Sequence, residues 1–494
     1  MHNLSVLLPG FLFLIAMLFI SVFMRREGKK SSGGFISEYF LGSRSLGGFV
    51  LAMTTVATYS SVSSFVGGPG QAWDVGFGWI YMSVVQVTAL FLVLGILGKK
   101  IAIVSRKLNA VTVIDVLRHR YESDVLANLS ALIIILFFGA TMVAQFVGGA
   151  KIFEAVTGYS YITGLVLFGL VIVIYTTVGG FRGVAITDTL CAIAMLIGMV
   201  VLLFGVLKAG GGYEAIMDNI AKNQPEMLTP LAGGKMPYTL YISQWLLVGV
   251  FTVGLPQSVV RCMSYKDTKS LHKAIIIGTI VIGAMNIGMN FIGVLSRGIL
   301  TGTLADYGNS VDNIMPITIA TSLNAVLAGI TIIGPIAASI STVSSLLLTA
   351  SSSIVKDIYM REMQKREKEV TERRAASYSQ ICTLVIGIII FAISVRPPDV
   401  IWKINMFAFG GLESAFVFIF VLGMFWKKAN KTGAIASIVG GTVTYCVTML
   451  LGIKVMGLHQ IVIGISVSLI CMVIGSLIGK PNKKEVLTYY FPDK

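Results

Sequence analysis

Long blocks of apolar residues, nearly free of charge, follow one another along the chain. Most of them approach the roughly 20 residues that a helix needs to cross about 30 Å of hydrocarbon. With the less regular segments counted as well, the pattern predicts an all-α membrane protein of about thirteen transmembrane helices. The clearest blocks are Leu4–Phe23, Trp79–Leu97, Leu126–Gly149, Ile162–Val178, Leu190–Leu207, Ile275–Leu295, Leu384–Val395 and Ile461–Ile478.

Two of the predicted spans are not clean helices. Segment Leu46–Gly70 carries hydroxyl residues through its middle and ends in Gly-Gly-Pro-Gly. Segment Tyr238–Pro256 contains Ser243 and Gln244 and closes on Gly-Leu-Pro. Polar side chains and helix breakers at membrane depth are tolerated only where the backbone faces protein or a water-filled cavity. Transporters use such interrupted helices to build a binding site near the midplane of the membrane.

Each irregular segment opens a block of five predicted spans. Because five is odd, the second block enters the membrane from the opposite side, which predicts a five-plus-five inverted repeat with interrupted first helices. The predicted organisation is an extra N-terminal transmembrane helix (1–30), a first inverted repeat (46–208), a second inverted repeat (238–426), two C-terminal transmembrane helices (433–479) and a cytoplasmic tail (480–494).

Composition supports this interpretation. Of the 494 residues, 55% are hydrophobic and 12% are charged, whereas about a quarter of a soluble domain is charged. The 38 Lys and Arg exceed the 23 Asp and Glu, for a net charge of +15. With the N-terminus outside and the C-terminus inside, about 30 of the 38 basic residues fall on the cytoplasmic side, as the positive-inside rule expects. That distribution argues against nucleic acid as a partner.

Several other classes of protein are not supported. The first apolar block is followed, not preceded, by the basic residues Arg25 and Arg26, so we interpret it as an anchor and not as a signal peptide. The five cysteines and four histidines are scattered, which indicates neither a disulfide framework nor a transition-metal site. Hydrolase and protease motifs are missing, so we do not expect an enzyme. We expect a multi-pass protein of the cell membrane.

The segment Gly334–Tyr359 is apolar enough to span, yet it is rich in hydroxyl groups. Such hydroxyls often bond to a carbonyl one turn earlier or aid helix packing. The alternative is that Ser341 and Thr342, which follow Ala338 on or near one helical face, meet unwound carbonyls of the first irregular segment. That arrangement would be an all-oxygen cage, the ligand type that a hard cation such as sodium prefers.

Particular motifs add a family resemblance. The Ala-x-x-Ser-Thr pattern ending at Thr342, followed by Lys-Asp-Ile-Tyr, resembles the signature of the sodium/solute symporter family. Segment Tyr175–Asp188 is similar to the Gly-Gly…Thr-Asp element of that family. The likeness extends from about Glu38 to Gly479. Four strings resemble the branch whose solute is pantothenate: Glu38–Thr54, Ala57–Gly70, Arg261–His272 and Phe407–Phe416.

The resemblance implies a sodium site. It assigns backbone carbonyls of Ala57, Ser60 and Ala338 and the hydroxyls of Ser341 and Thr342 as ligands. It also implies that Asp188 supplies negative potential near the inner exit of the cation, although an exposed Asp at a helix start is more often a cap.

Three positions depart from the pattern of the family or bear on the solute. Cys191 stands where relatives commonly have Gln, and Gln257 stands where the nearest branch often has His. Tyr59 occupies a position that is acidic in the proline-transporting branch, which argues against proline.

Polar residues at membrane depth are the candidates for the solute site, although each could instead form a hydrogen bond between helices. We interpret Trp245 as a packing residue rather than a gate. An unpaired Glu413 would cost free energy in the middle of a span. The candidates are Tyr59, Ser64, Ser83, Gln86, Gln145, Gln244, Trp245 and Glu413.

The resemblance therefore implies sodium-coupled uptake of pantothenate by alternating access, with Na+ as coupling ion, no cofactor, and the lipid bilayer as surroundings. Another small solute, such as a different monocarboxylate, a sugar or an amino acid, remains the alternative. A transporter-like sensor would need a soluble output domain, and only some fifteen residues follow Gly479, so we do not expect one.

Overall fold

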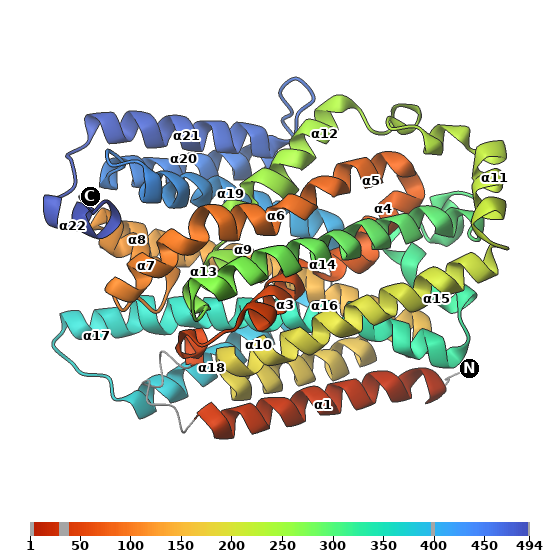
Figure 1. Ribbon diagram of the computed structural model, residues 1–494, viewed down its shortest axis with the longest axis horizontal. Coiled ribbons are helices and arrows are strands. Elements are labelled where there is room, and N and C mark those ends of the chain that lie inside the picture. The colour runs from red at the N-terminus through yellow and green to blue at the C-terminus, as the bar shows by residue number, and fades with distance from the viewer. Residues whose placement is uncertain (1–3, 29–38, 397–400, 493–494) are drawn as a thin grey trace.

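The protein is an elongated bundle of helices (Figure 1), and the computed structural model describes residues 4–28, 39–396 and 401–492 of it. Most helices run along the long axis, and the start of the first helix and the last helix (Lys484–Tyr490) lie at opposite ends of the bundle. Opposite ends are the arrangement that an odd number of crossings produces. Glu38, where the family resemblance begins, lies outside the described residues.

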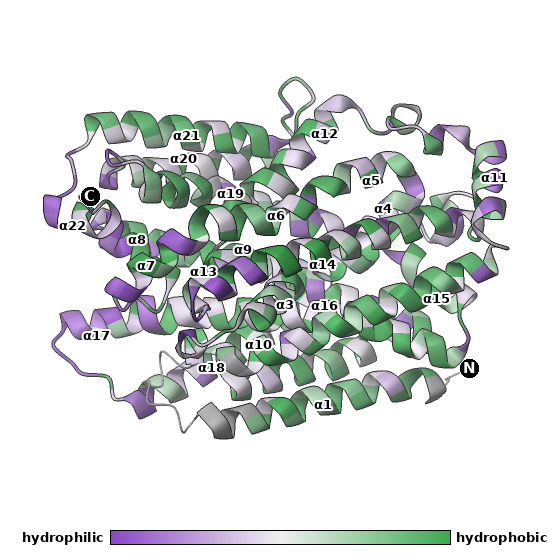
Figure 2. Cartoon of the chain, viewed as in Figure 1, coloured by the Kyte–Doolittle hydropathy of each residue, from purple (hydrophilic) through white to green (hydrophobic). Residues whose placement is uncertain are grey.

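Among the described residues, 11 helices are long and apolar enough to cross a membrane, or up to 13 if each of two bent pairs is one span. The expected all-α architecture is confirmed. Hydrophobic residues follow the helices through the middle of the bundle, and hydrophilic residues gather at its two ends (Figure 2), as a membrane protein requires. Seven unbent spans are single helices: α1 (Leu4–Gly28), α9 (Asp124–Thr157), α14 (Thr268–Leu295), α18 (Glu372–Ser394), α19 (Ile401–Phe425), α20 (Lys431–Leu450) and α21 (Gln460–Ile478). Two more are the halves of α10 (Tyr161–Ala209). The last two combine several helices: Phe77–Lys107 contains α5 (Phe77–Ser83), α6 (Val87–Leu92) and α7 (Lys99–Lys107), and α16 (Ala325–Ser352) continues through α17 (Arg361–Lys365).

Shorter helices connect or follow the spans. The capping box of Thr112 and Asp115 starts the first of them, because the two side chains satisfy each other's backbone N–H groups. These helices are α8 (Val113–Tyr121), α11 (Tyr213–Asn223), α15 (Ile314–Ser322) and α22 (Lys484–Tyr490).

The first bent pair is the interrupted helix that the sequence predicts between residues 46 and 70. Helix α3 (Gly48–Tyr59) ends at Ser60, where ψ is 93°, and a π-helical turn resumes at Ser63 and leads into α4 (Gly68–Val75). The two parts are bent by 67°. The break therefore lies at the hydroxyl residues in the middle of the segment, while the Gly-Gly-Pro-Gly sequence continues the helix.

The second bent pair confirms the predicted break at Gly-Leu-Pro. Helix α12 (Tyr238–Trp245) continues through irregular turns to Gly254, and α13 (Pro256–Ser264) begins after Leu255, whose ψ is 114°. Pro256 fits the first turn of α13 because its missing N–H needs no partner there. The bend is 42°.

Two spans lie at the centre of the bundle. In α16 and α19, 78% of the most apolar window is buried, against 22% in α1 and α18. Helix α1 accordingly lies along one edge of Figure 1, and α20 and α21 lie along the opposite edge. The hydroxyl-rich span that the sequence singles out is thus one of the two most enclosed in the protein.

Helix α10 contains a sharp reversal that separates the fifth and sixth spans. Gly180 has φ 59° and ψ −171°, a backbone conformation that glycine adopts readily and other residues do not. A Cβ atom at this position would also lie 2.8 Å from the ring of Tyr39. Glycine is therefore required for this turn.

Backbone hydrogen bonds join the two interrupted spans at one end. Leu46, just before α3, and Tyr265, just after α13, form an isolated parallel β-bridge. The Leu46 N–H donates to the Ser264 carbonyl at 3.2 Å, and the Lys266 N–H donates to the Leu46 carbonyl at 2.9 Å. The start of one interrupted span is thereby fixed to the end of the other.

Candidate functional site

The break after α3 lies directly against α16. The last turn of α3 closes with the Ser60 N–H donating to the Val56 carbonyl at 2.8 Å. The Ser341 hydroxyl of α16 lies 2.9 Å from the Ala57 carbonyl and 3.1 Å from the Ala338 carbonyl of its own helix. Three of the oxygens that the resemblance assigned to sodium therefore meet where α3 and α16 touch, although Ala57 and Ser341 are 284 residues apart in sequence.

We call this group of residues (Ala57, Ser60, Ala338, Ser341 and Thr342) the hydroxyl cluster. All five residues are buried, with Thr342 the most exposed at 3%. The hydroxyl oxygens of Ser60 and Thr342 have no hydrogen-bond partner, although a buried hydroxyl without a partner costs about 1–3 kcal/mol. Free hydroxyls beside carbonyls at a helix break are a donor set that suits a small hard cation.

A second group, the charged cluster, joins Asp188 of α10 and Arg261 of α13 to hydroxyls of α3 and α16 that lie about one turn from the hydroxyl cluster. Asp188 and Arg261 are 0% and 1% exposed, and the Arg261 Nη2 atom lies 3.7 Å from the Asp188 carboxylate. Arg261 donates to Ser345 of α16 at 2.8 Å and to Thr58 of α3, and the Thr54 hydroxyl donates to Asp188 at 2.7 Å. Asp188 is therefore not an exposed helix cap but the anionic half of a buried ion pair.

Arg261 is the residue that sequence reasoning missed. It follows Pro256 by five residues in a stretch that reads as the exit of the seventh span, yet α13 continues to Ser264 and buries it. The sequence did contain one signal: Asp188 and Arg261, of opposite charge, both lie near predicted span ends on the same side of the membrane.

Two of the solute candidates lie at the helix breaks. The Tyr59 hydroxyl donates to the Val248 carbonyl at 2.6 Å and so joins the two interrupted spans. The Gln145 side-chain oxygen accepts from the Val62 N–H at 2.8 Å, and its own carbonyl accepts from Ser339 at 2.8 Å. Gln145 thus supplies the partner that the broken helix lacks, and its amide nitrogen stays unpartnered.

The remaining solute candidates differ in surroundings. Ser83 bonds back to the Ile80 carbonyl at 2.9 Å, which is the structural role that hydroxyls often take in helices. Gln86 is buried and Ser64 is half-buried. Trp245 is 45% exposed on the outer surface of the bundle.

Gln244 and Glu413 share one property that the other candidates mostly lack. Both are buried, and the Gln244 side-chain oxygen and both Glu413 carboxylate oxygens have no hydrogen-bond partner. Gln244 also borders a mostly apolar groove of about 1380 Å³ between α9, α18 and α19.

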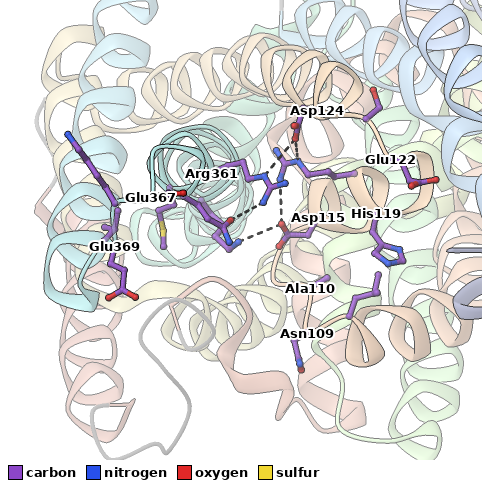
Figure 3. A pocket seen from close by; sticks show the side chains of 17 residues that line it. Asn109, Ala110, Asp115, His119, Glu122, Asp124, Arg361, Glu367 and Glu369 are labelled. Carbon is purple, nitrogen blue, oxygen red and sulfur yellow. Dashed lines mark hydrogen bonds and ion pairs between the residues drawn. The ribbon is translucent and has the colours of Figure 1, made fainter. Parts of the chain in front are cut away.

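A cavity of about 1060 Å³ lies elsewhere, between α8 and the end of the long α16–α17 span. Figure 3 shows Asp115, Asp124 and Arg361 turned toward one another there. Asp124 lies 3.1 Å from Arg118 and 2.9 Å from Lys365. None of the predicted sodium or solute residues lines this cavity. Its ion pairs connect the start of α9 to the loop helix α8 and to α17.

Two interrupted membrane spans, joined by Tyr59 and with the first break beside buried oxygens of α16, are typical of one class of protein, the secondary transporter with discontinuous helices. The model of the sodium:solute symporter family matches residues 39–441. The chain belongs to this family, and it is a multi-pass membrane protein.

Similar proteins cover nearly the whole chain. A sodium/pantothenate symporter of Haemophilus influenzae is 40% identical over 479 residues, which is 97% of each chain. A sodium/pantothenate symporter of Escherichia coli is 40% identical over 478 residues, again 97% of each chain. The solved structure of a Na+-coupled sialic acid symporter in its substrate-bound, outward-open state has a TM-score of 0.82 at 20% identity, covering 98% of this chain and 100% of that one. This last likeness concerns the fold.

Proposed function

We propose that this protein carries pantothenate into the cell together with sodium. The 40% identity to two sodium/pantothenate symporters, over 97% of each chain, supports the solute. The observation that carries the coupling is the Ser341 hydroxyl at 2.9 Å from the Ala57 carbonyl, because sodium bound there would join α3 to α16.

The proposed sodium ligands are the hydroxyl cluster. The unpartnered Ser60 and Thr342 hydroxyls add free oxygens to it. Asp188 contributes negative potential from one turn away, partly balanced by Arg261. For the solute site, the unpartnered groups of Gln145, Gln244 and Glu413 have the strongest support. The other proposed contacts are Tyr59, Ser64, Ser83, Gln86 and Trp245.

The proposed membrane arrangement is the five-plus-five inverted repeat, 46–208 and 238–426, with the N-terminus outside and the C-terminus inside. The repeats begin with the two bent spans. The basic end of the bundle around α7, α8 and α17 would face the cytoplasm, in agreement with the positive-inside rule.

Transport then follows alternating access. Sodium can favour one state only through its different affinities for the two states, so the hydroxyl cluster must be distorted when the protein opens inward. A tenfold sodium gradient supplies about 1.4 kcal/mol per ion, and the membrane potential supplies about 2.3 kcal/mol per net charge at 100 mV. One sodium with one monoanion moves no net charge, so a 1:1 cycle does not respond to voltage.

The test is uptake of labelled pantothenate by purified protein in liposomes. We expect uptake with an inward sodium gradient and only background uptake when choline replaces sodium. Unlabelled monocarboxylates, sugars and amino acids, added in excess, should leave most of the uptake intact. Equal uptake in sodium and choline would refute the coupling, and stimulation by an inside-negative potential would reject the 1:1 stoichiometry.

A further inference from the structure

Glu413 occupies an unusual position for a carboxylate. It lies near the middle of α19, is fully buried, and neither of its oxygens has a hydrogen-bond partner. Asp188, by contrast, faces Arg261 and accepts from Thr54, and Asp357 accepts from Thr112.

The face of α19 that carries Glu413 packs against both interrupted spans. A Cβ atom on Gly67, in the first interrupted span, would lie 3.4 Å from Trp402, and one on Gly254, at the second break, would lie 2.7 Å from the Val417 nitrogen. Trp402, Glu413 and Val417 are spaced by 11 and 4 residues, close to whole helical turns. Glu413 therefore faces the parts of the protein that alternating access must move.

The titratable neighbours do not compensate a negative charge. Within the described part of the chain, Tyr59 of α3 and Tyr445 of α20 interact electrostatically with Glu413. Tyrosine hydroxyls are ordinarily neutral near pH 7. An ionised carboxylate without a partner in an apolar interior costs far more than a protein can supply, so such a group takes up a proton instead.

We propose that Glu413 is a proton-binding site that is loaded each time the protein closes. Water reaches the carboxylate when the helices around the breaks separate, and there it is ionised. When they close, one proton passes from water to a Glu413 oxygen, forming the neutral acid, and the same proton returns to water at the next opening.

This inference makes transport depend on pH. One proton is taken up each time the protein closes. Where closing limits the rate of uptake, that rate therefore falls as pH rises. The fall is up to about tenfold per pH unit, once the pH exceeds the range in which Glu413 is protonated in the open state. The neutral acid also suits an anionic solute, a point that rests on the proposed function. The binding of the proton itself does not rest on it.

Infrared spectroscopy of the purified protein in liposomes tests the proton directly. At pH 8, we expect the carbonyl stretch of a neutral carboxylic acid, and we expect it to disappear in Glu413→Gln. Asp357→Asn serves as a matched buried-acid control and should retain the band. Among the described glutamates, Glu413 is the buried one, so labelling glutamate with ¹³C in the unaltered protein must shift the band. A spectrum without such a shift overturns the proposal even if the variant does not fold.

The pH profile of uptake provides the second test. Sodium-driven uptake by the unaltered protein should fall as pH rises. The uptake that Glu413→Gln retains, at whatever rate, should have a flat pH profile, because the amide resembles the neutral acid. Glu362→Gln, at a carboxylate that is 46% exposed and paired with Arg366, should keep the original profile. An unchanged pH dependence in Glu413→Gln would overturn the proposal. Absence of sodium-dependent uptake in every variant would instead reject the proposed function and leave the infrared result valid.

Discussion

The hydroxyl cluster and the charged cluster both involve hydroxyls of α3 and α16, about one helical turn apart, yet they hold their polar groups in different ways. In the charged cluster, positive charge is supplied from inside the protein by Arg261 at 3.7 Å from Asp188. In the hydroxyl cluster, carbonyls and hydroxyls converge without any cationic side chain, and two hydroxyls lack partners. This difference is what we expect if the charged cluster holds the helices together and the hydroxyl cluster binds sodium, as proposed above.

The largest effect should follow from breaking the charged cluster. Arg261→Met leaves Asp188 buried without its counter-charge, and removing one partner of a buried pair costs about 3–5 kcal/mol. Thermal unfolding in detergent measures this loss, and the double variant Arg261→Met, Asp188→Asn should recover most of it. A single variant as stable as the unaltered protein would mean that the pair is not a structural tie.

A smaller and more selective effect is expected in the hydroxyl cluster. Ser341→Ala removes the hydroxyl that meets the Ala57 carbonyl, a contact worth about 1.5 kcal/mol if it helps to bind a charged ligand. The sodium concentration for half-maximal uptake should then rise about tenfold. Ser351→Ala is the matched control, because Ser351 is buried in the same helix and bonds back to the Leu348 carbonyl at 3.0 Å. Equal sodium dependence in both variants would discard the site.

The smallest effect is expected at Thr342, where one substitution should change sodium binding and stability in opposite directions. Thr342→Val replaces the unpartnered hydroxyl by a methyl group of similar shape, so it should raise the unfolding temperature slightly, since the fold no longer buries an unsatisfied group. The same change should weaken sodium binding by about threefold, whereas Thr342→Ser should preserve it. Weaker sodium binding together with lower stability would instead indicate a packing role for Thr342.

Much of this arrangement follows from the sequence. The lengths of the apolar blocks predict the spans because hydrocarbon thickness fixes helix length, and Leu255–Pro256 marks the second break. Ser341 and Thr342 stand out because hydroxyls are rare in so apolar a segment. The meeting of these residues with Ala57 came from the family resemblance, since no periodicity relates two helices so far apart in sequence.

Other features required the three-dimensional structure. The first break lies at Ser60, where no glycine or proline marks it, because Gln145 of another helix supplies the missing backbone partner at Val62. From its sequence neighbours alone, Arg261 would be taken for a loop residue. Its burial follows from the packing of α13 against α3 and α16, which supply hydroxyl groups, and from Asp188 of α10, which lies 3.7 Å away.

The β-bridge between Leu46 and Tyr265 has a consequence for motion. It links the beginning of one interrupted span to the end of the other, so a tilt of either half-helix is transmitted to its counterpart. Because peptide groups make the link, exchanging the side chains at this corner leaves it in place. Two proteins whose side chains differ at this corner can therefore still move their interrupted spans together in the same way.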